Sequence, residues 1–187
     1  EKSIDRLINI VNDLDTISKL ESSMNRLNME RFDVVALAKE IAEQAEMEAD
    51  KKEIRISVKG ADNLPSPFWV SADKHYIGQV FVNLIINSIR YGKEGGQTRI
   101  RFRDMLDKIL VEVEDNGSGI SKEDLPRVFE KGFTGCNGRT DKRATGIGLY
   151  LCRRILEKLG HTIAITSTVG EGTTVRIGLQ QDALEVE

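Results

Sequence analysis

The strongest constraint on this chain is the segment 111–120, which passes from a strand-like pattern to a carboxylate followed by two closely spaced glycines. Apolar residues at 109, 111 and 113 recur with a period of two, which indicates a half-buried strand. Asp115-Asn-Gly then ends the strand with residues that tolerate a positive φ. Gly117 and Gly119 have no Cβ, so the backbone can approach another group closely. The segment predicts an acid at a strand end beside a slot for a planar ring, although a purely structural turn is the alternative.

A second group of polar residues lies on the helix predicted from Asp73 to Tyr91. Asn83, Asn87, Arg90 and Tyr91 follow one another at steps of four, three and one, so they share one edge of the helix among apolar neighbours. Burying two carboxamides costs free energy unless they are paired. A ligand or a metal would pair them, and a structural network of amides is the alternative.

Glycines also open the helix predicted over 147–159, in the sequence Thr145-Gly146-Ile147-Gly148-Leu149. The free N–H groups and the dipole at a helix start favour a phosphate. The preceding loop adds local positive charge through four basic residues, Lys131, Arg139, Lys142 and Arg143. These features indicate a phosphate-binding loop, and an ordinary solvated loop is the alternative.

The charge balance limits the possible partners. A formal net charge of -3 gives no overall attraction for nucleic acid or an anionic membrane, so we predict no nucleic-acid partner. Cys136 and Cys152 lie in unlike contexts, which indicates neither a disulfide framework nor a metal site and predicts a reducing compartment. No apolar run is long enough to span a membrane. The chain begins within a helical pattern, which leaves room for a membrane segment before it.

Residues 1–27 carry apolar residues at steps of three and four, the pattern of an amphipathic helix with a bundle seam. We expect this stripe to pack on a helix outside the sequence or on a second chain; packing on the chain's own domain is the alternative. The patterns downstream predict strands at 26–32, 54–58, 68–70, 97–103, 109–114, 162–168 and 173–179, helices at 33–50, 73–91 and 147–159, and a mobile loop at 121–145. This order predicts an α+β fold, a two-layer α/β sandwich whose mixed sheet is covered by helices on one face, plus the N-terminal bundle helix.

In this order and spacing, these segments resemble the ATP-binding catalytic domain of sensor histidine kinases, within the superfamily that also holds the gyrase, MutL and heat-shock chaperone ATPases. The resemblance covers residues 70–179, and residues 1–27 resemble the second helix of the family's dimerisation and phosphotransfer hairpin. It implies two domains, a partial hairpin at 1–27 and a catalytic ATP-binding domain at 28–187. Four segments carry it: an asparagine box at 83–91, a first glycine box at 115–119, a phenylalanine box at 129–133 and a second glycine box at 146–149.

The resemblance implies a site for ATP and Mg²⁺. Asp115 would accept a hydrogen bond from the adenine amino group, Tyr91 would flank the base, and Asn87 would coordinate Mg²⁺ through its amide oxygen. Asn83 and Arg90 would serve the phosphates and, with Asn87, form the catalytic group. The other implied nucleotide contacts are Gly117, Gly119, Ile120, Phe129, Lys131, Phe133, Arg139, Lys142, Arg143, Thr145, Gly146, Ile147, Gly148 and Leu149.

The implied activity is that of a protein histidine kinase, which transfers the γ-phosphate of ATP to a histidine on a hairpin helix that this chain lacks. The phosphate would pass to the receiver domain of a response regulator, and the full-length protein would form a homodimer through the hairpin. The resemblance to sensor histidine kinases also implies a membrane-anchored full-length protein with this part in the cytoplasm. His75 and His161 lack the sequence context of the family's acceptor, so we predict structural roles for both.

The alternatives are a serine kinase of the anti-sigma type and a non-catalytic, nucleotide-responsive scaffold. The long helix at 1–27 argues against the first, and the intact site residues argue against the second. The superfamily's ATPases activate water with a glutamate one helical turn before the magnesium-binding asparagine. Asn83 holds that place here and cannot act as a base, which favours phosphoryl transfer over hydrolysis.

Overall fold

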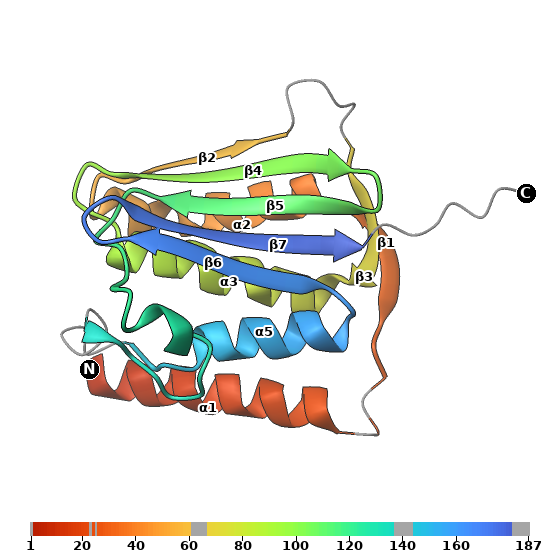
Figure 1. Cartoon of the computed structure of the whole chain (residues 1–187). Coiled ribbons are helices and arrows are strands. Elements are labelled where there is room, and N and C mark those ends of the chain that lie inside the picture. The colour runs from red at the N-terminus through yellow and green to blue at the C-terminus, as the bar shows by residue number, and fades with distance from the viewer. Residues whose placement is uncertain (1, 23, 25, 61–66, 137–143, 181–187) are drawn as a thin grey trace, which may run out of the picture.

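In a computed structural model, the chain forms two layers, a five-stranded sheet and a set of helices that covers one of its faces (Figure 1). The structure describes residues 2–22, 24, 26–60, 67–136 and 144–180. The elements in chain order are α1 (Lys2–Glu21), β1 (Met29–Asp33), α2 (Val34–Asp50), β2 (Arg55–Lys59), β3 (Trp69–Asp73), α3 (Lys74–Tyr91), β4 (Gln97–Met105), β5 (Lys108–Asp115), η1 (Leu125–Arg127), α5 (Gly148–Lys158), β6 (Thr162–Thr168) and β7 (Gly172–Gln180). None of the helices in these ranges combines the length and the apolar composition that a membrane span requires.

The five-stranded sheet has the strand order β2-β4-β5-β7-β6. Strand β2 runs parallel to β4, and the other neighbours are antiparallel, so the sheet is mixed. Strands β1 and β3 pair with each other in a separate antiparallel sheet at one end of the molecule. The predicted α+β sandwich is confirmed. The predicted loop at 121–145 contains the short helix η1.

Two aspartates begin two of the helices that cover the sheet. The Asp33 carboxylate accepts a hydrogen bond from the Val35 N–H at 3.0 Å, where α2 begins. The Asp73 carboxylate accepts from the Tyr76 N–H at 3.3 Å, where α3 begins. Such caps satisfy N–H groups that have no partner within the helix. The helices lie side by side in the order α2, α3, α5, α1, with α3 in contact with β5 (Figure 1).

Helix α1 packs in part on its own domain, so the expectation that its stripe faces an outside helix was wrong for the C-terminal half. Ile17 and Leu20 are 4% and 2% exposed and belong to the core. Glu21 also pairs with Arg154 of α5, with 3.1 Å between the charged atoms. The N-terminal half of the stripe, Ile4, Leu7 and Val11, stays exposed.

Helix α1 also ends at Glu21 and not at residue 27. The Ser22 hydroxyl accepts a hydrogen bond from the Met24 N–H at 3.3 Å. A serine that binds the backbone locally in this way competes with helical hydrogen bonds. The helix therefore ends at Glu21, just before the two serines at positions 22 and 23 of the sequence.

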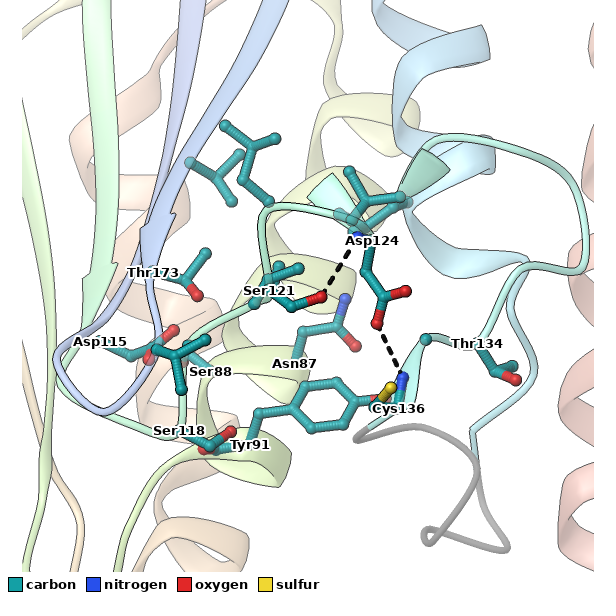
Figure 2. A pocket seen from close by; sticks show the side chains of 18 of the residues that line it. Asn87, Ser88, Tyr91, Asp115, Ser118, Ser121, Asp124, Thr134, Cys136 and Thr173 are labelled. Atoms are coloured by element: carbon teal, nitrogen blue, oxygen red, sulfur yellow. Dashed lines mark hydrogen bonds between the residues drawn. The ribbon is translucent and has the colours of Figure 1, made fainter. Parts of the chain in front are cut away.

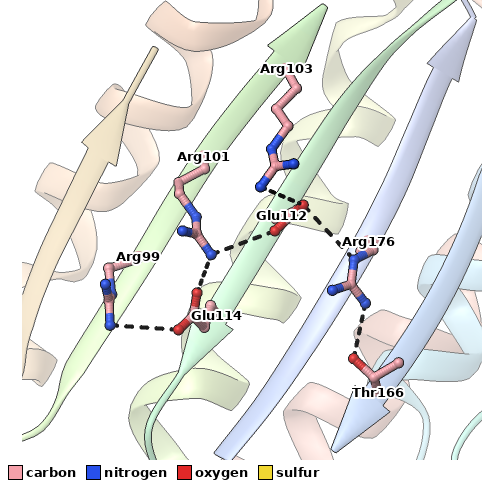
Figure 3. Close-up of polar contacts among 7 residues, drawn as sticks. All are labelled: Arg99, Arg101, Arg103, Glu112, Glu114, Thr166 and Arg176. Carbon is pink, nitrogen blue, oxygen red and sulfur yellow. Dashed lines mark hydrogen bonds and ion pairs between the residues drawn. The ribbon is translucent and has the colours of Figure 1, made fainter. Parts of the chain in front are cut away.

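The sheet face away from the helices is polar, and its arginines and glutamates pair across strands (Figure 3). Glu112 is 5% exposed and lies 3.5 Å from Arg101, 3.6 Å from Arg103 and 3.9 Å from Arg176. Opposite charges on neighbouring strands stabilise a sheet. Because side chains alternate along β5, the register that turns Glu112 outward turns Asp115 towards the helix layer.

His161 should make the stability of the fold depend on pH. Its side chain is buried at the start of β6, Nδ1 accepts a hydrogen bond from the Gln180 N–H at 3.1 Å, and Nε2 has no partner among the described residues. Burial lowers the pKa of His161 below its usual 6.5. The unfolded chain therefore takes up a proton that the fold excludes, and the free energy of unfolding falls as the pH drops below about 6.5.

The variant His161→Asn keeps an acceptor oxygen near Nδ1 but cannot titrate, so it should flatten the melting temperature between about pH 5 and pH 7. The exposed His75 supplies the control, since His75→Asn should leave the pH dependence of wild type. An unchanged slope in His161→Asn would assign the pH dependence to another group.

Candidate functional site

A cavity of about 290 Å³ lies between the sheet and the helix layer (Figure 2). Leu84 of α3, Val113 of β5, Ile165 of β6 and Val175 of β7 give it apolar walls. Asp115 lies at the end of β5 on the lining of this cavity, as the alternation of the strand predicts. Tyr91 and Asn87 line it from α3.

Asp115 is a desolvated carboxylate held by backbone donors. Its Oδ1 accepts a hydrogen bond from the Gly117 N–H at 2.9 Å. Burial raises the pKa of Asp115, hydrogen bonds from the backbone of Gly117 and Thr173 oppose that rise, and the charge of Glu114 adds to it. A fixed acceptor beside an apolar space can select a flat ring that carries a hydrogen-bond donor on its edge.

Gly117 and Gly119 allow the loop after β5 to pack closely against the rest of the fold. A Cβ at 117 would lie 2.2 Å from the Tyr91 carbonyl oxygen, and one at 119 would lie 2.1 Å from the Thr168 carbonyl oxygen. Gly119 also has a φ of 71°, which favours glycine. The close approach that we predicted for these glycines is thus to the chain's own backbone, and it fixes Asp115 relative to α3 and the β6–β7 turn.

A second cavity, of about 510 Å³, adjoins the first and is polar on its α3 side. Asn83, Asn87 and Arg90 line it along the predicted edge of α3. The Asn83 Nδ2 donates to the Gln79 carbonyl at 3.0 Å, whereas the Asn87 amide has no hydrogen-bond partner among the described residues. The residues that line both cavities are Asn87, Tyr91, Val128, Phe133, Thr134 and Leu149.

The second glycine box closes the other side of this cavity. Gly146 has a φ of 71°, and its carbonyl accepts a hydrogen bond from the Gly132 N–H at 2.8 Å. This bond joins the two ends of the segment 132–146, which we call the lid. Helix α5 begins at Gly148 with no side-chain cap, so its first N–H groups lack helical partners. A Cβ at Gly148 would lie 2.9 Å from the Asn83 Oδ1, so a larger residue there would displace the Asn83 side chain where α5 meets α3.

Most of the predicted site residues line the two cavities, namely Asn83, Asn87, Arg90, Tyr91, Asp115, Gly119, Ile120, Phe133, Thr145, Gly146, Gly148 and Leu149. Gly117, Phe129, Lys131 and Ile147 are not among the lining residues. The Phe129 ring lies 5.6 Å from the Arg153 guanidinium, and the Lys131 Nζ lies 5.9 Å from the Tyr150 ring, both over α5. Arg139, Lys142 and Arg143 lie outside the described residues.

The sequence patterns missed several lining residues. Thr173 lies opposite Asp115 in the β5–β7 pairing and lines the first cavity. Its place could be found only once that pairing was known. Asp124 also lines the first cavity and accepts a hydrogen bond from the Cys136 N–H at 2.9 Å (Figure 2). Three residues of α1, Asn9, Asn12 and Asp13, line the second cavity.

Comparison with known proteins places this site in a family. Residues 72–183 match the model of the histidine kinase-, DNA gyrase B- and HSP90-like ATPases. The chain is 30% identical over 172 residues to the alginate biosynthesis sensor protein KinB of Pseudomonas aeruginosa, covering 92% of this chain and 28% of KinB. It is 31% identical over 183 residues to the sensor histidine kinase WalK of Bacillus subtilis, covering 96% of this chain and 29% of WalK. The chain thus spans less than a third of each of these relatives.

A solved structure of the catalytic domain of the histidine kinase ThkA superposes with a TM-score of 0.72 at 28% identity, covering 82% of this chain and 96% of that one. A structure of ThkA in complex with the response regulator protein TrrA superposes with a TM-score of 0.75 at 25% identity, covering 95% of this chain and 48% of that one. The family match covers more than half of the chain, including α3, β5 and the start of α5, and it implies ATP binding. The chain belongs to the family of histidine kinase-, DNA gyrase B- and HSP90-like ATPases.

Proposed function

We propose that this chain is the ATP-binding catalytic part of a sensor histidine kinase, which transfers the γ-phosphate of ATP to a histidine on a hairpin helix. The continuity of the two cavities carries the proposal. The apolar cavity with Asp115 shares six lining residues with the polar cavity that contains Asn83, Asn87 and Arg90, so that one ligand could fill both. A purine base suits the first cavity and a phosphate chain suits the second.

In this proposal, Asp115 accepts from the adenine amino group and Tyr91 flanks the base. Arg90, Asn83 and the N–H groups at the start of α5 hold the phosphates. Asp115 lines the first cavity, Tyr91 lines both, and Asn83, Arg90 and Gly148 line the second, which supports the assignment. Phe133 lines both cavities and lies 4.4 Å from the Arg127 guanidinium, so it can anchor the lid beside the nucleotide.

The site suits a Mg²⁺ ion that is coordinated jointly by the protein and the nucleotide. The described residues contain no cluster of three or more His, Cys, Asp or Glu side chains that could hold a metal alone. Mg²⁺ commonly takes one or two oxygen atoms from the protein and the rest from phosphates and water. The Asn87 amide has no hydrogen-bond partner in the part of the chain that the structure describes and lies on both cavities, so it can supply such an oxygen. When bound, Mg²⁺ would neutralise phosphate charge.

Phosphoryl transfer is favoured over hydrolysis by the residue one turn before Asn87. Asn83 occupies that turn, and its Nδ2 is engaged with the Gln79 carbonyl. An amide cannot take a proton from water, so the chain lacks the base that the hydrolytic members of the superfamily place there. Arg90, Asn83 and the α5 N–H groups would act by positioning and charge stabilisation.

The wider organisation follows the same proposal. Residues 1–27 form part of the dimerisation and phosphotransfer hairpin, and residues 28–187 form the catalytic domain. The exposed Ile4, Leu7 and Val11 support contact with the rest of the hairpin in a homodimer. The ThkA structure contains a response regulator protein, and we propose a receiver domain as partner here too. We place this part in the cytoplasm, where ATP is available, in a membrane-anchored full-length protein.

The direct test is phosphoryl transfer in trans. The chain alone should bind ATP with Mg²⁺ but acquire no phosphate on histidine. A separate hairpin that contains the acceptor histidine should become labelled from γ-labelled ATP when the chain is added, because its helices can cover the exposed stripe of α1. A hairpin without that histidine is the control, as is the chain variant Leu7→Glu, which should reduce transfer without changing ATP affinity.

Label on His75 or His161 of the isolated chain would contradict the missing acceptor. Rapid ATP hydrolysis would instead place the chain with the ATPases of the family.

A further inference from the structure

The second cavity has a wall from α1 to which no role has been assigned. Asn9, Asn12 and Asp13 line it together with Asn83 and Arg90 of α3. Among the described residues on this lining, Asp13 and Arg90 are the charged ones. The described lining therefore has one negative and one positive side chain, although the proposed ligand is a polyphosphate.

The packing of α1 explains why Asp13 faces the cavity. Ile17 and Leu20 lie four and seven residues after Asp13, on the same face of the helix, and both are buried against the domain. The Glu21–Arg154 ion pair holds the end of the same helix to α5. Asp15 lies on the exposed side and pairs with Lys19 at 2.8 Å. Docking of α1 thus brings one particular carboxylate to the cavity.

The electrostatic surroundings of Asp13 agree with this position. Burial raises the pKa of the Asp13 carboxyl, and the positive charge of Arg90 opposes that rise. Burial, and to a lesser degree the charge of Asp13, also raise the pKa of the Cys152 thiol inside α5. Asp13 is thus close enough to Arg90 for the two charges to interact, and both residues line the cavity where the phosphates are proposed to bind.

We propose that Asp13 sets nucleotide affinity by opposing the phosphate chain, because in the docked position of α1 its carboxylate neutralises the charge of Arg90. Polyphosphate binding and the docking of α1 then disfavour each other, and this antagonism is reciprocal. ATP should loosen α1, whereas adenosine, which has no phosphate, should not. The inference rests on the proposed function, since it assumes that adenine binds beside Asp115 and the phosphates beside Arg90.

The experiment measures the affinities of the whole chain for ATP and for adenosine by calorimetry in a metal-free buffer. Asp13→Asn keeps the shape of the side chain and removes its charge. This variant should bind ATP about fivefold more tightly or better, and its affinity for adenosine should be unchanged. Asp15→Asn removes the same charge from the exposed side of α1 and should change ATP affinity less than about twofold. Added salt should reduce the effect of Asp13→Asn.

Hydrogen exchange gives a second readout that tests the movement of the helix. ATP should speed exchange of the amides at 13–20 in wild type, adenosine should not, and Asp13→Asn should weaken the effect of ATP. Melting temperatures confirm that both variants fold.

Unchanged ATP affinity in Asp13→Asn would overturn the inference. Weaker binding of ATP with Mg²⁺ in that variant would also overturn it and would make Asp13 a metal ligand. A lower rate of ATP hydrolysis with unchanged affinity would instead identify Asp13 as a base. Failure of wild type to bind adenosine at all would contradict the proposed function itself, and the inference with it.

Discussion

Replacing Asp115 with alanine should weaken ATP binding by about 1.5–3 kcal/mol, which is the net worth of a hydrogen bond to a charged group. That loss corresponds to roughly a tenfold to hundredfold rise in Kd. The carboxylate lies at the edge of the apolar cavity, where it accepts from a backbone N–H, so it is already oriented before a ligand binds. Calorimetry with ATP and adenosine would measure the effect, and both ligands should lose the same free energy because the contact is with the base.

Base selectivity gives the sharper form of this prediction. Adenine presents an amino group where guanine presents a carbonyl, and a carboxylate accepts only from the former. Wild type should therefore bind GTP much more weakly than ATP.

Asp115→Asn is the matched control, because asparagine has nearly the same shape but can also donate. This variant should bind ATP more weakly than wild type does, and the difference between its affinities for ATP and GTP should be smaller. Equal affinities for ATP and GTP in wild type would contradict the role of Asp115.

Burial also predicts how the variants behave as folded proteins. Desolvation raises the pKa of Asp115, so the ionised form is less favourable in the fold than in the unfolded chain. Asp115→Asn should therefore be no less stable than wild type at neutral pH, and its weaker ATP binding would not reflect unfolding.

The position of Asp115 could be predicted from sequence because local rules determine it. The alternation along 109–115 places Val111, Val113 and Asp115 on one side of the strand, and Figure 2 shows Asp115 at the cavity. Helical spacing likewise placed Asn83, Asn87 and Arg90 on one edge of α3, where they line the second cavity. Asp33 and Asp73 marked the starts of α2 and α3 through their capping preference.

Features that depend on contacts between distant segments could not be read in this way. Thr173 reaches the cavity because β7 pairs with β5, and no local pattern encodes that pairing. The sequence alone does not show which of Phe129 and Phe133 contacts the ligand. Only Phe133 lines the cavities, and Phe129 lies near Arg153 of α5. The stripe of α1 has one helical period throughout, but Ile17 is buried in the core and Val11 is exposed, and this difference arises from packing on distant segments.

Asn87→Ala should remove the effect of Mg²⁺ on ATP binding. In wild type, Mg²⁺ should strengthen ATP binding because the Asn87 oxygen and the phosphates both coordinate the ion. The ratio of the Kd for ATP without Mg²⁺ to the Kd with Mg²⁺ should be well above one. In the variant this ratio should fall to about one, while adenosine affinity stays close to wild type because Asp115 is intact. Titrations of ATP and adenosine with Mg²⁺ and with a chelator would measure both quantities.

Asn83→Ala is the control for the loss of an amide from the same helix edge. Its Nδ2 already bonds to the Gln79 carbonyl, so the variant should weaken ATP yet keep the dependence on Mg²⁺. If the effect of Mg²⁺ on ATP binding survives in Asn87→Ala and disappears in Asn83→Ala, the metal ligand is Asn83, one turn earlier on α3. If the effect survived in both variants, the ion would be held by the phosphates and by residues outside this edge, and Asn87 would be a structural amide.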